Sequence, residues 1–245
     1  MSRPSIIAID GPAASGKTTL GQQLADALGY LYIDTGMMYR AVTLAVLERG
    51  VGIDDEAAVT DLAGSLVIDV RRSEPGARYP STVYLNGVDV TDRLRSRKVE
   101  ANVSAVSAIL GVRAAMTVQQ RRIGEQGRVV MVGRDIGTVV FPDADLKLYL
   151  DAAVTERARR RWHDYQDDGN EGTYEHVLDA MRKRDAYDSQ RQHAPLRAAQ
   201  DAVIVDTTNR TPEEVLKHVL ALVEANSEGE SPSEVDPSPQ EEANA

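Results

Sequence analysis

The feature that most constrains this chain is the octapeptide GPAASGKT at residues 11–18, which fits the pattern G-x-x-x-x-G-K-[ST] at every fixed position. An apolar run precedes it at residues 5–10 and a helical pattern follows it through Leu28, which is the strand–loop–helix setting that the motif requires. Its glycines let the backbone close around a phosphate, and the following helix directs its positive dipole end to the same anion. The residues expected to bind ATP are Gly11, Pro12, Ala13, Ala14, Ser15, Gly16, Lys17, Thr18 and Thr19.

Three polar side chains of this loop have separate expected roles. Lys17 places a mobile charge near the β- and γ-phosphates and is predicted to be catalytic, and the Thr18 hydroxyl is a candidate ligand for Mg²⁺. Asp10 either orients the loop or a metal-bound water, or only caps the turn. Because such loops serve switches, motors, synthetases and kinases, the loop alone does not define the reaction. No Asn-Lys pair occurs in the chain, which argues against a guanine-binding switch.

Strand and helix patterns alternate along most of the chain. Strands are expected at residues 5–10, 30–33, 128–132, 146–150 and 202–206. Helices are expected at residues 36–48, 112–125, 154–166, 173–187 and 212–225. Such alternation predicts an α/β fold, in which a parallel sheet carries helices on both faces.

Two segments depart from this alternation. Short strands are expected at residues 66–72 and 82–90, the second with a tight Asn86-Gly87 turn, and a helix is expected at residues 96–109. We interpret residues 54–101 as an inserted α+β subdomain within a P-loop domain of residues 1–225. Residues 226–245 hold six acidic residues, no basic ones and little to bury, so a disordered, solubilising acidic tail is expected.

Composition and charge limit the partners and the location. The chain has no cysteine, which excludes disulfides and thiolate chemistry. The amino-terminal apolar run is too short for a signal peptide, and no stretch reaches the about 18 apolar residues of a membrane span, so a cytoplasmic location is expected. The net charge of −10 becomes −4 without the tail, which argues against nucleic-acid binding. No long apolar stripe demands a partner, so a monomer is expected.

Arginines occur in three turn-like settings that suit a second, acceptor phosphate. Arg40 follows the second expected strand, Arg134 follows the third, and Arg184 and Arg191 lie at the end of a helix. The guanidinium fork matches phosphate oxygens bidentately, and open α/β sheets bind ligands at the carboxyl ends of their strands. One arginine alone is more often a surface ion-pair partner, but three such motifs beside a phosphate-binding loop indicate an anion site.

A further basic cluster, Arg157, Arg160 and Arg161, shares one face of an expected helix. One interpretation is a solvated basic face. The other is a mobile lid at residues 155–175, with Gly169 and Gly172 at its tip, that closes over ATP and adds charge to the transition state. On that interpretation Arg157 and Arg161 are candidate catalytic residues.

Four segments, IDGPAASGKTT, DTGMMYRA, GRDIGTVVFPDAD and KRDAYDSQR, together resemble bacterial cytidylate kinases over residues 6–223. The resemblance implies a P-loop core with a short lid and an enlarged monophosphate-binding insert, which transfers the γ-phosphoryl group of ATP to CMP or dCMP with Mg²⁺. It implies that Arg40, Arg134 and Arg191 hold the acceptor phosphate. It places Thr35, Arg184 and Asp188 near the sugar, and Ser104, Arg113 and Asp135 at the cytosine edge. Arg184 joins Lys17, Arg157 and Arg161 as a candidate catalytic residue.

Two features depart from the family pattern. Val132 stands where the family often has an acidic residue, which moves the expected Mg²⁺ site to Thr18 with Asp10 or Asp34. The acidic tail has no counterpart in the family pattern. The residues alone also leave open an ATP-binding regulatory module, or a P-loop kinase for another small acceptor.

Overall fold

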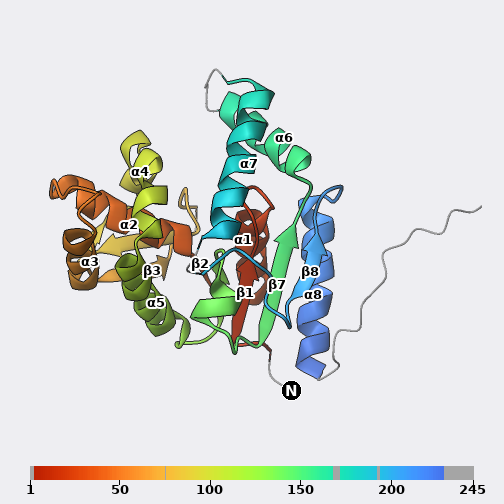
Figure 1. Ribbon diagram of the computed structural model, residues 1–245. Coiled ribbons are helices and arrows are strands. Elements are labelled where there is room, and N and C mark those ends of the chain that lie inside the picture. Colours follow the sequence, from red (N-terminus) through yellow and green to blue (C-terminus); the bar gives the residue numbers. More distant parts are fainter. Residues whose placement is uncertain (1–2, 75, 168–171, 192–193, 229–245) are drawn as a thin grey trace, which may run out of the picture.

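The computed structural model describes residues 3–74, 76–167, 172–191 and 194–228 (Figure 1). Its central sheet has the strand order β2-β6-β1-β7-β8, and all neighbouring strands are parallel. The strands are β1 (Ile6–Asp10), β2 (Leu31–Asp34), β6 (Val129–Val132), β7 (Leu146–Asp151) and β8 (Val203–Asp206). The predicted parallel sheet is therefore confirmed, and each of its strands agrees with the expected range to within one residue at either end.

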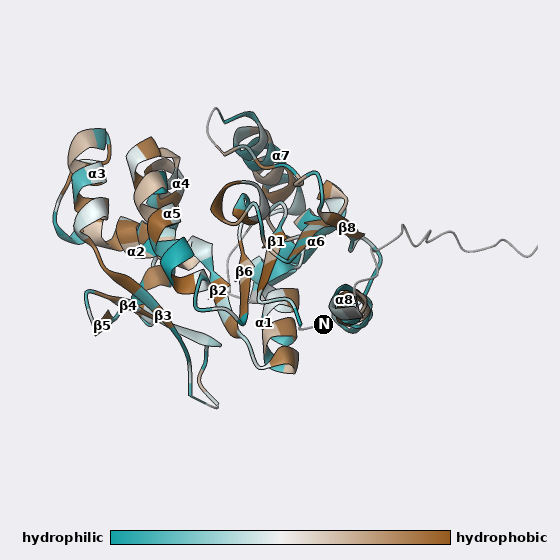
Figure 2. Ribbon diagram, turned by 90° about the horizontal axis from the view of Figure 1, so that it is seen from below, coloured by the Kyte–Doolittle hydropathy of each residue, from teal (hydrophilic) through white to brown (hydrophobic). Residues whose placement is uncertain are grey.

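Alternating side chains along the strands give the sheet two apolar faces. On one face Ile7 and Ile9 pack against α1 (Lys17–Leu28) and α8 (Pro212–Glu228). On the other face Ala8 and Met131 pack against α2 (Thr35–Glu48) and α5 (Leu110–Gly124). Hydrophobic segments accordingly lie on the central strands and on α1 and α2 (Figure 2). Helices on both faces let these strands be apolar throughout, as parallel sheets require.

The predicted insert forms a second, antiparallel sheet of order β3-β4-β5. Its elements are α3 (Glu56–Ser65), β3 (Ile68–Arg72), β4 (Ser81–Leu85), β5 (Val88–Asp89), the 3-10 helix η1 (Thr91–Arg95) and α4 (Arg97–Ala108). The Asn86-Gly87 turn has positive φ at both residues, 50° and 83°, and joins β4 to β5, so the tight hairpin expected within residues 82–90 is confirmed. α3 and η1 were not expected from the sequence.

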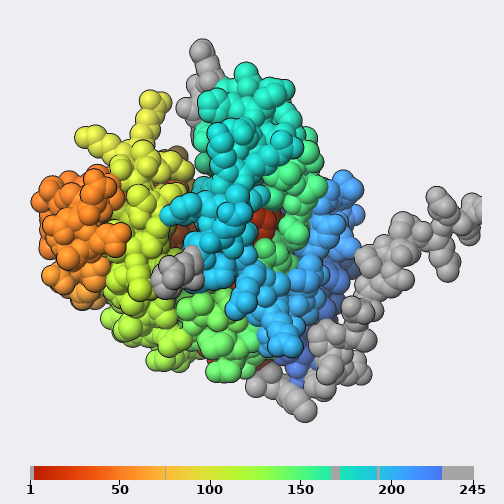
Figure 3. All heavy atoms as spheres, viewed as in Figure 1, coloured from red at the N-terminus to blue at the C-terminus, as the bar shows by residue number. Residues whose placement is uncertain are grey.

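Two helices rise over the carboxyl ends of the strands. α6 (Val154–Asp167) and α7 (Tyr174–Gln190) bury Ala158, Val177 and Met181 between them and against Ala13 and Ala14 of the phosphate-binding loop. Figure 1 shows this pair above the sheet, with the insert to one side. The tip expected at Gly169 lies outside the described residues. In Figure 3, red atoms of the amino-terminal segment lie at the bottom of a hollow beside α7.

α8 continues to Glu228, three residues into the segment predicted to be a disordered tail, and residues 229–245 lie outside the described part. Within the described ranges no single helix is long and apolar enough to cross a membrane. α4 and α5 pass that test only as a pair, and they are bent by 96° to each other.

Candidate active site

The backbone of the phosphate-binding loop requires glycine at its start. Gly11 has a φ of 147°, and a Cβ there would lie 2.1 Å from the carbonyl oxygen of Leu150. Gly16 has a φ of 92° and Ala14 a φ of 59°, which shapes the turn into the first residue of α1. The amino terminus of α1 therefore opens directly onto the loop, where its unpaired N–H groups favour an anion.

Lys17 lies folded back on its own loop. Its Nζ donates to the carbonyl oxygen of Pro12 at 2.5 Å. Burial, and then the positive charge of Arg134, lower the pKa of Lys17 to about 7. An anion beside this ammonium group would offset the free-energy cost of its burial. Lys17 is therefore expected to bind a phosphate group that enters the loop.

Asp10, the last residue of β1, is hydrogen-bonded to the segment that follows β6. Its two carboxylate oxygens accept from the backbone N–H groups of Ile136 and Gly137, each at 2.8 Å, and burial raises its pKa to about 6. The two donor N–H groups lie at the start of a short π-helix, Ile136–Val140, that follows β6. Among the roles left open for Asp10, this geometry favours an orienting one, because it fixes the segment that carries Arg134 and Asp135.

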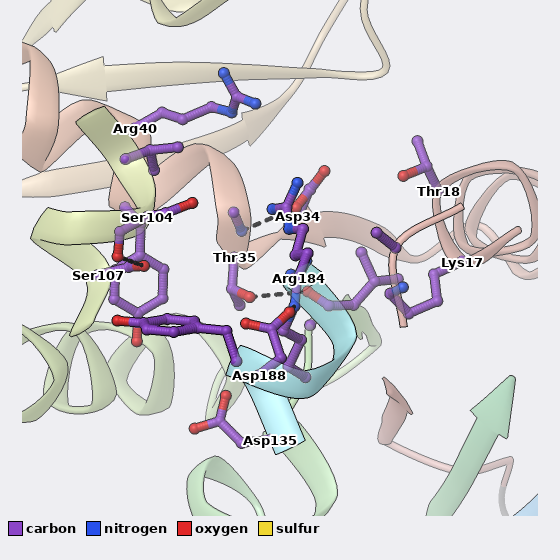
Figure 4. Close-up of a pocket in the computed structure, with 18 of the residues that line it drawn as sticks. Lys17, Thr18, Asp34, Thr35, Arg40, Ser104, Ser107, Asp135, Arg184 and Asp188 are labelled. Atoms are coloured by element: carbon purple, nitrogen blue, oxygen red, sulfur yellow. Dashed lines mark hydrogen bonds and ion pairs between the residues drawn. The ribbon is translucent and has the colours of Figure 1, made fainter. Parts of the chain in front are cut away.

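Two cavities meet over the carboxyl end of the sheet. The smaller has a volume of about 230 Å³ and the larger about 780 Å³. Figure 4 shows Ser104 and Ser107 on one side of the site, Lys17 and Thr18 on the other, and Arg184 with Asp188 between them. The residues that line both cavities are Ala13, Ala14, Lys17, Thr18, Arg40 and Arg184.

The smaller cavity brings together every residue predicted for the acceptor side. These are Thr35, Arg40, Ser104, Arg113, Arg134, Asp135, Arg184, Asp188 and Arg191. They come from helices and turns that are far apart in the sequence. Of the predicted ATP-binding residues, the larger cavity exposes Ala13, Ala14, Gly16, Lys17, Thr18 and Thr19, whereas Gly11, Pro12 and Ser15 are buried within the loop.

A buried ion pair forms the deep end of the smaller cavity. Arg113 on α5 donates through Nη2 to Asp135, and both side chains are less than a tenth exposed. Arg113 also donates to the carbonyl oxygen of Ser107 at 3.3 Å and lies over the ring of Tyr39. The pair therefore holds a carboxylate and a guanidinium side by side in fixed orientation.

Three more arginines line the walls of the smaller cavity. Arg134 donates through Nε to Asp188 at 2.5 Å. Arg40 donates to Glu100 at 2.9 Å and to the carbonyl oxygen of Leu94 at 3.2 Å.

Arg191 is the third. It donates through Nε to the carbonyl oxygen of Ala194 at 2.5 Å, and its buried Nη2 lacks a hydrogen-bond partner among the described residues. Nη2 lies 4.0 Å from Asp135 Oδ1, too far for a hydrogen bond, and a buried donor without one suits an anionic ligand.

Arg184 lies where the cavities join. It forms no ion pair with the described residues, and both burial within the cleft and the charge of Arg134 lower its pKa. Thr35, which also lines the smaller cavity, donates to the carbonyl oxygen of Val132 at 2.9 Å. Val132, the departure from the family pattern, thus contributes its backbone to the site.

The basic cluster on α6 does not act as one face. The Arg157 side chain is 5% exposed, donates to Asp185 at 2.7 Å and to the carbonyl oxygens of Ala152 and Ala13, and lines neither cavity. The solvated-face interpretation is therefore wrong for Arg157, and this placement also argues against its predicted catalytic role. Arg160 donates to the carbonyl oxygen of Thr207. Of the two arginines of this helix that were predicted to be catalytic, Arg157 and Arg161, only Arg161 is among the residues that line the larger cavity.

Among the residues of the larger cavity that sequence reasoning missed, two come from the insert. Arg95, from η1, lines the cavity wall, and Glu100, from α4, bridges Arg40 and Arg161 at 2.9 and 3.7 Å. Their segment, residues 91–100, shows only a charged run in the sequence, which is also typical of an ordinary surface.

The oxygens near the loop fit a magnesium ion. Thr18 and Asp34 line the same cavity, and Asp34 uses only Oδ1, which caps α2 by accepting from the backbone N–H of Gly36 at 2.9 Å. Mg²⁺ prefers oxygen ligands and usually takes only one or two from protein when phosphates are present. Because both oxygens of Asp10 already accept hydrogen bonds, Asp34 is the better partner for Thr18. In the described part of the chain no group of three or more acidic or histidine side chains could hold a metal without phosphates.

Comparison with known proteins gives a consistent result. A family model described as Cytidylate kinase matches residues 7–225. The Cytidylate kinase of Chloroflexus aggregans is 50% identical over 220 residues, which cover 90% of this chain and 94% of that protein. That of Herpetosiphon aurantiacus is 48% identical over 223 residues, 91% of this chain and 96% of that protein. That of Bacillus licheniformis is 43% identical over 228 residues, 93% of this chain and its full length.

Proposed function

This chain belongs to the cytidylate kinase family and transfers a phosphoryl group from ATP to CMP or dCMP, and we propose that its two joined cavities divide these substrates between them. The observation that carries the division is the shared lining. Lys17, Thr18, Arg40 and Arg184 border both cavities, so two phosphate groups would meet among cationic side chains. The larger cavity, beside the phosphate-binding loop, takes ATP, and the smaller takes the monophosphate.

The acceptor side would recognise three parts of CMP. Arg40, Arg134 and Arg191 bind its phosphate, which replaces Glu100 and Asp188 as the partner of two of these guanidinium groups. Thr35 and Asp188 lie near the sugar. At the deep end of the cavity, Asp135 accepts from the exocyclic amine of cytosine and Arg113 donates to its ring acceptors, with Ser104 at the rim.

Catalysis then requires positioning and charge stabilisation. A phosphate oxygen of CMP attacks the γ-phosphorus, the bond from that phosphorus to the bridging oxygen breaks, and ADP departs with the electron pair. The acceptor oxygen is already anionic, so no general base is needed. Lys17 leaves the carbonyl oxygen of Pro12 and, with Arg184 and Arg161, neutralises charge on the transferring group while both substrates stay in line.

Thr18 and Asp34 are the residues that would hold Mg²⁺ in this site. When bound with ATP, Mg²⁺ neutralises charge on the phosphates. Substituting Asp34 by Asn should weaken Mg²⁺-dependent ATP binding more than ATP binding without the metal. Isothermal titration with and without Mg²⁺ measures this difference.

A panel of acceptors tests the proposal. ADP release is measured with CMP, dCMP, UMP and AMP, and kcat/KM should be highest for CMP and dCMP. A preference for UMP or AMP would overturn the assignment of Arg113 and Asp135 to cytosine. ATP binding without turnover on any acceptor would leave the regulatory-module alternative, which no observation favours at present.

Two further proposals are supported by the sequence alone. They are a cytoplasmic location, and a monomer without nucleic-acid or membrane partners. Size-exclusion chromatography with light scattering tests the second, because a dimer would elute at twice the chain mass of 26.7 kDa.

A further inference from the structure

The insert contributes one arginine to the larger cavity. Arg95 ends η1 and lines the cavity together with Lys17 and Thr18 of the phosphate-binding loop. Arg160 and Arg161 line the same cavity from α6. Cationic side chains therefore face this space from the loop, from α6 and from the insert.

Arg95, like Arg184 but unlike the other arginines of this cavity, has no acidic partner within the described ranges. Arg40 and Arg161 contact Glu100, and Arg160 contacts Glu156. Within the described ranges Arg95 forms neither an ion pair nor a hydrogen bond, and its side chain is exposed. An arginine in a cavity with its N–H groups uncommitted keeps its whole fork available to an anion.

The Arg95 guanidinium nevertheless has a defined place. Its central carbon lies 4.9 Å from the ring centroid of Tyr79, a cation–π contact. Stacking occupies the face of the guanidinium, so the N–H groups at its edge remain free to donate. The turn below is anchored, because Leu94 is fully buried and the Thr91 hydroxyl accepts from the backbone N–H of Val83 at 2.9 Å.

We propose that Arg95 is a phosphate-binding residue of the donor side, which bonds phosphate oxygens of the nucleoside triphosphate from the insert, and that Tyr79 positions it. The inference rests on the proposed function, in which the larger cavity takes ATP. Its consequence is that the insert, which carries Ser104 to the acceptor, also contacts the donor. ATP and CMP then each favour the same placement of the insert.

Four variants and a matched control test this role. Arg95→Gln removes the charge but keeps an amide. Arg95→Lys keeps the charge without the fork. Tyr79→Phe keeps the ring face, and Tyr79→Leu removes it. The control is Arg93→Gln, because Arg93 lies on the same turn but pairs with Glu48 and lines neither substrate cavity.

Loss of a charged hydrogen bond to phosphate predicts a fall of about 10- to 100-fold in kcat/KM for ATP in Arg95→Gln, with KM for CMP changed less than about 3-fold. Arg95→Lys should recover part of the loss. Tyr79→Leu should cost about 2- to 5-fold through the lost cation–π contact, whereas Tyr79→Phe and Arg93→Gln should match the wild type. Binding of a fluorescent ATP analogue, measured without acceptor, should fall in the same order.

Three results would overturn the inference. They are wild-type ATP kinetics in Arg95→Gln, a loss confined to CMP, and an equal loss in Arg93→Gln. If Arg95→Gln melts well below the wild type, the Tyr79→Leu and Tyr79→Phe pair decides, because only the ATP readout should separate them. Absence of turnover in the wild type would count against the proposed function instead, and the fluorescent-nucleotide titration would still test Arg95.

Discussion

The donor and acceptor regions of this site are built in different ways. The centre of the donor site is a phosphate-binding loop of nine consecutive residues, 11–19, whose backbone geometry and helix dipole attract a phosphate. The acceptor site collects side chains from α2, α4, α5, α7 and the segment after β6. The first is a local structure that a short motif specifies, whereas the second exists only once the chain has folded.

The two regions also differ in how their charges are compensated. On the acceptor side, Arg113 pairs with Asp135 and Arg134 pairs with Asp188 in the structure described here. On the donor side, Lys17 has no carboxylate partner among the described residues, and its pKa is lowered by burial. The acceptor region can therefore select its substrate through the fixed orientation of its charged side chains. In the donor region the positive charge of Lys17 is compensated only when the phosphates of the substrate bind.

The largest expected effect comes from removing the donor-side ammonium. Lys17→Ala should lower kcat by about 10²- to 10³-fold, as expected when a contact to the charge of the transition state is lost. The stability of this variant should not fall. Folding lowers the pKa of Lys17 to about 7, which means that the charged lysine destabilises the folded state. This destabilisation is complete below pH 7 and fades as pH rises toward the unfolded value near 10.5. Steady-state kinetics and melting curves at pH 6.5 measure both effects.

Lys17→Arg is the matched control, because it keeps the positive charge on a side chain with a different reach. Near-normal turnover in Lys17→Ala would contradict the donor mechanism and leave the loop as a binding element only.

On the acceptor side, Asp135→Asn should reduce kcat/KM for CMP by about 10- to 150-fold, since one charge-assisted hydrogen bond is lost. The new amide can donate to the carbonyl of uracil, so the ratio of CMP to UMP activity should fall at least as far. The variant should also be less stable, because Arg113 is left as a buried, uncompensated cation.

The ratio of the two activities is the useful readout, because both are measured on the same variant and a partial loss of folded protein cancels. An unchanged ratio would show that Asp135 stabilises Arg113 without reading the base.

The same contrast explains what could be predicted from the sequence. The strands of the central sheet are short apolar runs, so their positions follow from local pattern, and the loop follows from its motif. α3 was missed, although Asp55 caps it by accepting from the backbone N–H of Ala58 and Val59, Leu62 and Ala63 mark its buried face. The cap and the apolar spacing of α3 are therefore visible in the sequence, at the edge of the expected insert.

The partners of single arginines could not be predicted. Arg157 and Arg161 are four residues apart on one helix, yet one is buried against Asp185 of α7 and the other faces a cavity. That difference depends on where α7 packs, which neither helical spacing nor charge pattern encodes. The arginines of the acceptor site, Arg40, Arg134, Arg184 and Arg191, could be predicted from their settings beside the phosphate-binding loop, whereas the other acceptor residues were predicted only through the resemblance to a family.

Arg157 tests whether α6 contributes a second catalytic arginine besides Arg161. Arg157→Met should lower stability by about 1–3 kcal/mol, because it leaves Asp185 and the Ala13 carbonyl oxygen without their partner, while kcat changes less than about 3-fold. Arg159→Gln is the control, because its pair with Glu156 is exposed and should contribute little to stability. Urea unfolding and kinetics well below the melting temperature separate the two effects. A 100-fold loss of kcat at unchanged stability would restore the catalytic role.

The smallest expected effect is the uptake of a proton when a nucleotide binds. This uptake should differ between the donor and acceptor regions. At pH 8 most of the Lys17 side chain should be neutral in the free protein, since its pKa is about 7, and a bound triphosphate should restore its charge. ATP binding at pH 8 should therefore take up as much as about one proton, and at pH 6 almost none, because Lys17 is already charged there. CMP binding should take up far less at pH 8, since the arginines that receive it stay protonated. Calorimetric titrations in buffers of different ionisation enthalpy measure the uptake, and in Lys17→Arg the uptake on ATP binding should disappear while that for CMP stays as it was. Equal proton uptake for both nucleotides in the wild type would contradict an uncompensated charge on Lys17. The donor and acceptor regions would then differ only in their geometry.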